Sequence, residues 1–261
     1  MSFKTILFSV DQGVATLTFN RPEKLNAVNQ EMAAEIARAV ALVAGDPAVR
    51  VLLLTGAGRA FMAGADIRIF LEMDPLAGKR FAERAQNLLF QLESLEVPVL
   101  ACVNGLALGG GLEIAMACDL IYASEEARFG LPEVGLGIIP CLGGTQRLAR
   151  LVGKGLAKEL CLTGRAVDAA EAKMMGMAAQ VFPAAAFPEE CRKMAQSLAK
   201  KSRAALAAAK LVIGRGFDLD LRSALALEAD AFALCLAGPD PREGAAAFLE
   251  KRPPRFAGSL P

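Results

Sequence analysis

The chain has 261 residues, which is enough for one large domain or for a domain with a helical appendage. Hydrophobic residues make up 54% of the chain, a share that excludes an intrinsically disordered protein. Its 29 basic and 28 acidic residues leave a formal net charge of +1. Net charge therefore gives no reason to expect nucleic acid or an anionic membrane as the main partner.

The chain contains no histidine, and its six cysteines are scattered without a CxxC pair. A zinc site is therefore not expected, and we assign no metal ligand. Most of these cysteines lie in apolar runs, which is typical of buried reduced thiols and suits the cytoplasm. No signal peptide is visible, and the longest apolar run, residues 97–108, is shorter than the roughly 20 residues that span a membrane.

The first part of the chain predicts a hairpin, a helix and a buried strand. Residues 3–10 and 14–20 form two runs with alternating apolar positions, separated by a short turn. Asn29 can cap a helix whose apolar stripe ends at Gly45. Residues 49–55 are almost continuously aliphatic, which indicates a strand that is buried on both faces of a sheet.

The next part of the chain repeats this order. Asp66 opens a short helix, and an apolar stripe over 81–95 predicts a longer one. A buried strand at 98–103 then leads through a glycine loop to a helix at 110–117 and a strand at 119–123. Because strands and helices alternate, we predict an α/β fold with right-handed crossovers.

From about residue 187 onward the pattern predicts only helices. Apolar faces recur over 197–213, 219–236 and 241–251, and many of these positions are alanine. We therefore divide the chain into an α/β core at residues 1–195 and a C-terminal helical region at residues 196–261. The apolar faces of that region must be covered by the core, by each other or by another subunit.

Two glutamates are the candidate proton-transfer groups in a chain without histidine. Glu113 lies in the first turn of the helix that Gly110 opens, where the helix dipole favours an ionised carboxylate and hence a base. Glu133 lies in an apolar loop, where burial raises a carboxyl pKa and favours an acid. Taken singly, each glutamate is also explained by a structural role.

Glycine-rich turns could supply backbone donors for a developing negative charge. The triplet at 109–111 lacks the GxGxxG spacing of dinucleotide sites and the lysine of a P-loop. A second glycine site, residues 61–66, lies between a buried strand and a helix capped by Asp66. Each turn could offer one amide to a two-donor pocket, although a tight turn alone explains either. A third glycine-rich segment, residues 143–147, is expected to begin a helix capped by Thr145 and to form the floor behind Glu133.

Seven short motifs follow one another in a defined order. They are NRPEKLNA (20–27), FMAGADI (61–67), VNGLALGGG (103–111), CD (118–119), FGLPE (129–133), GGTQR (143–147) and FLEKRP (248–253). Any one of them is weak, but the ordered set resembles the enoyl-CoA hydratase/isomerase (crotonase) superfamily over nearly the full length. The resemblance implies a spiral of stacked ββα units with a C-terminal helical region that forms trimers, and two trimers commonly form a hexamer.

The resemblance also implies a coenzyme A thioester as substrate and no separate cofactor. By the same analogy, the amides of Ala65 and Gly110 form an oxyanion hole for the thioester oxygen. The residues expected along coenzyme A and the thioester are Lys24, Leu25, Ala63, Asp66, Ile67 and Arg68. Arg68 stands where lysine is frequent and Cys141 where a small residue is usual, so the preferred acyl length stays open.

Both glutamates stand where hydratases of the superfamily carry them. The chain therefore most resembles an enoyl-CoA hydratase of fatty-acid or related acyl-CoA degradation, which adds water to a trans-2-enoyl-CoA. The alternatives are a Δ3,Δ2-enoyl-CoA isomerase, another CoA-thioester hydratase of a dedicated catabolic route and, more remotely, an RNA-binding member of the superfamily.

Overall fold

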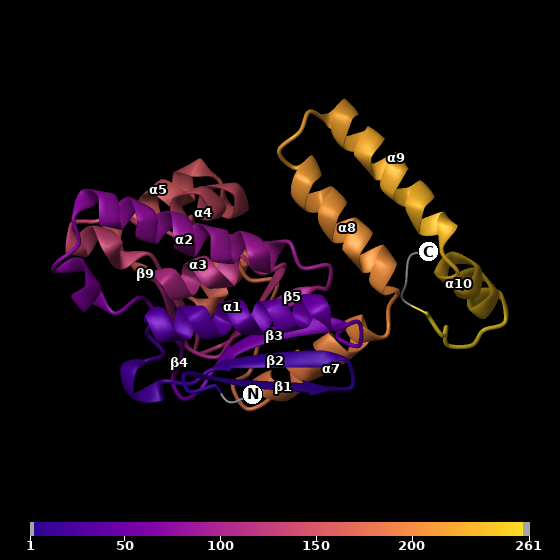
Figure 1. Cartoon of the computed structure of the whole chain (residues 1–261), viewed down its shortest axis with the longest axis horizontal. Coiled ribbons are helices and arrows are strands. Elements are labelled where there is room, and N and C mark those ends of the chain that lie inside the picture. Colours follow the sequence, from indigo (N-terminus) through magenta and orange to yellow (C-terminus); the bar gives the residue numbers. More distant parts are fainter. Residues whose placement is uncertain (1–2, 258–261) are drawn as a thin grey trace.

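Two largely parallel β-sheets form the centre of the molecule (Figure 1). In the computed structural model, which describes residues 3–257, the larger sheet has the strand order β1-β2-β3-β5-β7-β10 and the smaller β4-β6-β8-β9. The strands are β1 (Ile6–Asp11), β2 (Val14–Phe19), β3 (Val51–Gly56), β4 (Ala60–Ala63), β5 (Val99–Val103), β6 (Leu106–Leu108), β7 (Leu120–Ser124), β8 (Arg128–Gly130), β9 (Ala166–Asp168) and β10 (Gln180–Phe182). Only the pairs β1–β2 and β8–β9 are antiparallel among these strands.

The larger sheet contains the strands that the sequence predicts most clearly. The predicted hairpin is present, with Asp11 of β1 opposite Val14 of β2. The central strands β3 and β5 are buried on both faces, because helices cover the sheet on each side. Successive side chains of β3 alternate between two cores, as the two-residue period of a strand requires.

The smaller sheet was not predicted from the hydrophobic pattern. Its strands are three or four residues long, and residues 61–63, expected as part of a turn, lie in β4. Each of three successive strands of the larger sheet is followed by one of the smaller sheet and then by a helix, in the order β3-β4-α2, β5-β6-α3 and β7-β8-α4. This repeated order is the stacked ββα architecture that the family resemblance implied.

Helices cover both faces of the larger sheet. The α-helices of the described chain are α1 (Gln30–Gly45), α2 (Pro75–Glu93), α3 (Gly110–Met116), α4 (Gly144–Val152), α5 (Lys154–Thr163), α6 (Ala169–Met174), α7 (Phe187–Ala199), α8 (Arg203–Gly216), α9 (Leu221–Ala237) and α10 (Asp240–Leu249), and not all of them contact the sheet. Asn29 caps α1 as predicted, since its side chain accepts a hydrogen bond from the Met32 amide. In the part of the chain that the structure describes, no helix combines the length and hydropathy needed to cross a membrane.

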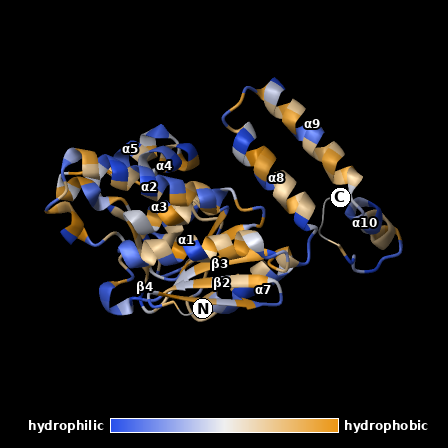
Figure 2. Ribbon diagram, viewed as in Figure 1, coloured by the Kyte–Doolittle hydropathy of each residue, from blue (hydrophilic) through white to orange (hydrophobic). Residues whose placement is uncertain are grey.

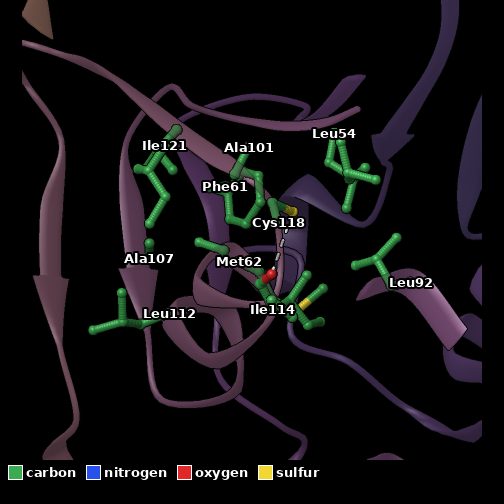
Figure 3. Close-up of a cluster of buried hydrophobic side chains, with 14 of the residues drawn as sticks. Leu54, Phe61, Met62, Leu92, Ala101, Ala107, Leu112, Ile114, Cys118 and Ile121 are labelled. Carbon is green, nitrogen blue, oxygen red and sulfur yellow. Dashed lines mark hydrogen bonds between the residues drawn. The ribbon is translucent and has the colours of Figure 1, made fainter. Parts of the chain in front are cut away.

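The main core lies between the larger sheet, the smaller sheet and α1–α3 (Figure 3). Leu54 of β3, Phe61 of β4 and Leu112 of α3 all belong to this core. A strand of each sheet and a helix therefore share one apolar interior. A second core lies on the other face of the larger sheet, where Leu53 and Cys102 pack beneath Cys191 of α7. Packing on both faces fixes the ends of the parallel strands, from which the candidate site is built.

The chain beyond the last strand divides into one packed helix and an arm. α7 packs on the larger sheet, whereas α8, α9 and α10 extend away from the core (Figure 1). The single helix predicted over 197–213 is wrong, because the chain breaks after α7 and the side chain of Ser202 caps a new helix at the Ala205 amide. The boundary placed near residue 195 falls inside α7, and the division of the chain into two functional regions stays a prediction.

Polar contacts fix the base of the arm, and hydrophobic residues recur along its helices (Figure 2). Lys210 of α8 lies 2.8 Å from Asp119 and also donates to the Val97 carbonyl. Neither α8 nor α9 contains a buried residue in the described chain. The large apolar side chains exposed on the arm are Leu211, Ile213, Phe217, Leu219, Leu221, Leu225, Phe232, Leu234, Leu236, Phe248 and Leu249.

Shortening a core leucine tests the central packing. Leu54 is fully buried, so Leu54→Ala removes contacts on all sides and is expected to lower the free energy of unfolding by about 2–5 kcal/mol. Leu162 on α5 is 74% exposed, and Leu162→Ala is expected to change it by less than about 0.5 kcal/mol. Urea unfolding at one fixed protein concentration measures both, and equal effects of the two substitutions would contradict this assignment of the core.

Candidate active site

Glu113 lies in the first turn of α3 but binds a different segment of the chain. Its side chain is buried, and its Oε1 atom accepts hydrogen bonds from the Leu142 amide at 2.8 Å and the Gly144 amide at 2.6 Å. Gly144 is the first residue of α4, and Leu142 lies two residues before it. Within the described residues no donor reaches Oε2, so this oxygen can accept a hydrogen bond from water or substrate.

The pKa of Glu113 differs from the sequence-based expectation. The helix dipole was expected to favour the ionised form, but the pKa is raised to about 7. Burial is the largest cause and the negative charge of Glu133 adds to it, whereas the Gly144 and Leu142 amides and Arg147 act in the opposite direction. Desolvation outweighs the dipole of a seven-residue helix, and Glu113 is close to half ionised at neutral pH.

Glu133 lies in the short 3-10 helix η3 (Pro132–Leu136), which follows β8. Burial raises its pKa, which is the direction that its apolar sequence context predicted. Its Oε2 atom is buried and has no hydrogen-bond partner in the described chain. A buried carboxyl oxygen without a partner is costly unless it is protonated or meets water or a substrate, so Glu133 has the environment of a proton donor.

Close approach of the chain to Glu133 requires glycine at position 109. Gly109 has a φ of +52°, which other residues rarely adopt, and a Cβ there would lie 2.9 Å from Oε1 of Glu133. The two glutamates come from consecutive ββα units, and the charge of Glu133 acts on Glu113. The structure therefore brings the two predicted proton-transfer groups into one site.

The glycine turns after β4 and β6 also meet. These strands are parallel neighbours, so their carboxyl ends lie side by side. A Cβ on Gly109 would lie 3.6 Å from the Cα atom of Gly64, and one on Gly110 would lie 4.0 Å from the Gly64 carbonyl carbon. The amides of Ala65 and Gly110 donate no hydrogen bond within residues 3–257. Two free amides at adjacent turns can bind one oxygen.

The first motif of the chain lies beside the second. Lys24 and Leu25 follow one another at the short helix η1 (Pro22–Lys24), and the carbonyl of Leu25 accepts from the Ala63 amide at 2.9 Å. Val28 forms a parallel bridge with Ala65. The structure thus brings three predicted coenzyme A contacts next to a predicted oxyanion donor.

The remaining predicted contacts lie at the rim, in the short helix η2 (Ile67–Phe70). The Asp66 side chain caps η2 and forms an ion pair with Arg68, which holds the pKa of Asp66 at about 2. Ile67 is 58% exposed. Arg68 is therefore engaged with a carboxylate of its own segment, an interaction that the sequence motif did not indicate.

Residues 143–147 bind Glu113, an interaction that the sequence did not predict. The Gly144 amide donates to Glu113, while the predicted role of this segment as the floor behind Glu133 stays a prediction. Thr145 does not cap the helix, because the N-cap residue is Gly143 and no side chain caps α4. The nearby Cys141 thiol has its pKa raised to about 11, mainly by burial, so it is not a thiolate at neutral pH.

Comparison with known proteins identifies the family. The family model described as enoyl-CoA hydratase/isomerase matches residues 9–259. The chain belongs to the enoyl-CoA hydratase/isomerase family. A crotonyl-CoA hydratase of Syntrophomonas wolfei is 42% identical over 98% of this chain and 99% of its own length. A 2,3-dehydroadipyl-CoA hydratase of Escherichia coli is 41% identical, over 97% of this chain and 98% of its own.

Solved structures of the enoyl-CoA hydratase/isomerase family have the same fold. A crystal structure of an enoyl-CoA hydratase from Bacillus anthracis superposes with a TM-score of 0.94 at 36% identity, over 98% of this chain and 100% of that one.

The amides of Leu142 and Gly144 are site groups that the sequence analysis missed. The paired glycines at 143–144 were a usable signal, because a Cβ on Gly144 would lie 2.8 Å from Oε1 of Glu113.

The raised pKa of Glu113 predicts a pH-dependent cost in stability. In the unfolded chain this carboxyl titrates near 4.5, whereas in the folded protein it titrates near 7. The folded state therefore keeps a proton that the unfolded chain has lost, and stability falls as pH rises between these values, by about 3 kcal/mol in total. Glu113→Gln abolishes this titration, and the glutamine oxygen can still accept both amides.

We therefore expect Glu113→Gln to be more stable than the native protein at pH 8, by up to about 3 kcal/mol, with the difference shrinking toward pH 5. Urea unfolding across this pH range measures the effect. The exposed Glu126 provides a matched control, since Glu126→Gln should follow the native curve. Parallel curves for Glu113→Gln and the native protein would show that Glu113 titrates normally.

Proposed function

We propose that the protein is an enoyl-CoA hydratase, which adds water to a trans-2-enoyl-CoA and releases the 3-hydroxyacyl-CoA. The observation that carries the proposal is the meeting of Glu113 and Glu133 beside two adjacent turns with free amides. Two carboxyl groups with raised pKa values can transfer protons near neutral pH, and paired amides can bind an oxyanion. The names of the relatives, which are hydratases of crotonyl-CoA and 2,3-dehydroadipyl-CoA, support the same reaction.

The amides of Ala65 and Gly110 would bind the thioester oxygen. Addition at the β-carbon pushes electrons through the conjugated system onto that oxygen, which becomes enolate-like. Donors that are already in place stabilise this charge without a reorganisation cost. The short distance between Gly64 and Gly110 supports a single pocket for one oxygen.

The two glutamates would divide the proton transfers. Glu113 in its ionised form accepts a proton from water as the oxygen bonds to the β-carbon, and protonated Glu133 gives a proton to the α-carbon. A proton then passes from Glu113 to Glu133 to restore the starting state, so that one water is consumed and nothing else. Because both groups titrate in one site, their pKa values belong partly to the pair. Water addition is redox-neutral, and we propose that it needs no metal or separate cofactor.

Coenzyme A would lie along the first two motifs. Lys24, Leu25 and Ala63 form one side of this path, and Asp66, Ile67 and Arg68 lie near the thioester end. The hydrogen bond between Leu25 and Ala63 supports a continuous surface. The exposed Lys24 carries the positive charge suited to a phosphate, while Arg68 would have to share its charge between Asp66 and the ligand.

We also propose that the protein works in the cytoplasm, in the degradation of fatty acids or related acyl-CoA compounds. All six cysteines are free, which suits a reducing compartment. The exposed apolar side chains of the arm support a homo-oligomer, either a trimer or a dimer of trimers.

Replacing each glutamate by its amide tests the reaction. Glu113→Gln and Glu133→Gln are each expected to lower the rate of crotonyl-CoA hydration by about 10²–10⁴-fold, since each removes one proton transfer. Loss of absorbance of the conjugated thioester measures hydration. Glu126→Gln, at an exposed glutamate, should leave the rate unchanged.

Near-native turnover in either site variant would refute the two-carboxylate mechanism. A panel of trans-2-enoyl-CoA and 3-enoyl-CoA substrates separates hydratase from isomerase activity. A protein that only moves the double bond of the 3-enoyl thioester would be an isomerase.

The oligomeric state is the second test. Because the arm exposes apolar side chains on all three of its helices, we expect a trimer or hexamer whose stability rises with protein concentration. Phe232 is 65% exposed on α9, and Phe232→Asp should favour smaller species. Light scattering across the micromolar range measures the mass, and a single-chain mass throughout for the native protein would overturn the assignment.

A further inference from the structure

The two amides that bind Glu113 come from one loop, residues 141–144, which we call the Glu113-binding loop. In a trans peptide group the carbonyl and the N–H point in opposite directions, so binding the oxygen orients the N–H. The Leu142 amide shares its peptide group with the Cys141 carbonyl, which accepts from Nε2 of Gln86 at 2.8 Å. Gln86 of α2 therefore holds the far side of the peptide that donates to Glu113.

The second donor is held in the same way. The Gly144 amide shares its peptide group with the Gly143 carbonyl, which accepts from the amides of Gln146 at 3.0 Å and Arg147 at 2.8 Å. These two amides belong to the first turn of α4. The start of this helix thus fixes one peptide group, and the side chain of Gln86 fixes the other.

The peptide group between these two is bound by the side chain of Arg147. Its Nη1 atom donates to the Leu142 carbonyl at 2.7 Å, and its Nε atom donates to Glu93 at 2.6 Å. The guanidinium lies 5.7 Å from the ring centre of Phe90 and occupies the space that a Cβ on Gly143 would need. The side chain is only 14% exposed, so these contacts are largely protected from solvent.

All three α2 contacts lie on one face of that helix. Gln86, Phe90 and Glu93 are spaced by four and three residues, which places them in a row along the helix. The loop is therefore held from outside by a regular helix, while its amides point inward at Glu113. A rigid scaffold of this kind can keep a buried carboxylate in one orientation.

We propose that Gln86 and Arg147 are positioning residues for Glu113, which hold the Glu113-binding loop so that both of its amides aim at Oε1. Neither side chain forms a hydrogen bond with Glu113 in the described chain, and neither carries a proton in the reaction. The kinetic consequence rests on the proposed hydratase function, whereas the hold on the loop does not depend on it.

Titratable groups outside the loop also influence Glu113. They are Glu133 on η3 and Arg147 on α4, and the charge of Glu113 in turn acts on the thiols of Cys141 and Cys161. Both thiols have raised pKa values and stay neutral near pH 7. A change in the titration of Glu113 after replacement of Gln86, which is uncharged, therefore reports on the loop itself.

Gln86→Ala and Arg147→Gln test the kinetic consequence. Each is expected to lower kcat for crotonyl-CoA about 10–100-fold with KM changed less than about threefold, because the base is misplaced while the binding surface is kept. The acid limb of the kcat profile should move to higher pH in both, since looser amides, and in Arg147→Gln a lost positive charge, stabilise ionised Glu113 less. Gln91→Ala on α2 and Arg150→Gln on α4 are matched controls at exposed positions.

Amide hydrogen exchange of the loop, followed by mass spectrometry, tests the hold without any assay of activity. Residues 141–144 should exchange faster in Gln86→Ala and Arg147→Gln than in the native protein and the two controls. Unchanged loop exchange in Gln86→Ala, or a native kcat and pH profile with faster exchange, would overturn the proposal. If the native protein hydrates no enoyl thioester, the function fails and exchange alone decides the positioning role. Should Arg147→Gln not fold, Gln86→Ala decides both parts.

Discussion

The pair of hydrogen bonds from the Leu142 and Gly144 amides to Glu113 is the interaction on which the site depends. A buried carboxylate is costly, and burial raises its pKa to about 7 despite these two donors. With fewer donors the group would stay protonated and could not act as a base at neutral pH. With full solvation it would titrate near 4.5 and accept protons poorly. The balance between desolvation and two fixed amides sets the chemistry that Glu113 can perform.

The two-sheet architecture supplies the remaining groups. The neighbouring parallel strands β4, β6 and β8 end on one side of the smaller sheet, and the segments after them carry Ala65, Gly110 and Glu133. Each successive ββα unit thus adds one part of the site. The larger sheet is packed on both faces and keeps these units in fixed register. Close packing therefore holds the backbone atoms of the site in defined positions. Consequently, residues that are 23 to 68 positions apart in the sequence lie at one site.

The hydrophobic pattern predicted the long strands and most of the long helices. It did not predict the short strands or the contacts between residues that are distant in the sequence. The strands at 51–56 and 99–103 were predictable because burial on both faces leaves an aliphatic run. The strands of the smaller sheet are too short to show a period, and the helix break before Ser202 was hidden by alanines on both sides. Glu113 and Glu133 stood out because the chain lacks histidine, but the bond from Gln86 to Cys141 joins positions 55 residues apart. The direction of the Glu113 pKa shift was mispredicted because burial is a tertiary property.

The most direct test of this account is the titration of Glu113 in the native protein. Difference infrared spectroscopy as a function of pH detects the protonated carboxyl, and the band that is missing in Glu113→Gln belongs to this residue. The account predicts half-protonation near pH 7, where the buried group retains its proton and yet can ionise. Half-protonation below about pH 5, the range of an ordinary glutamate, would contradict it.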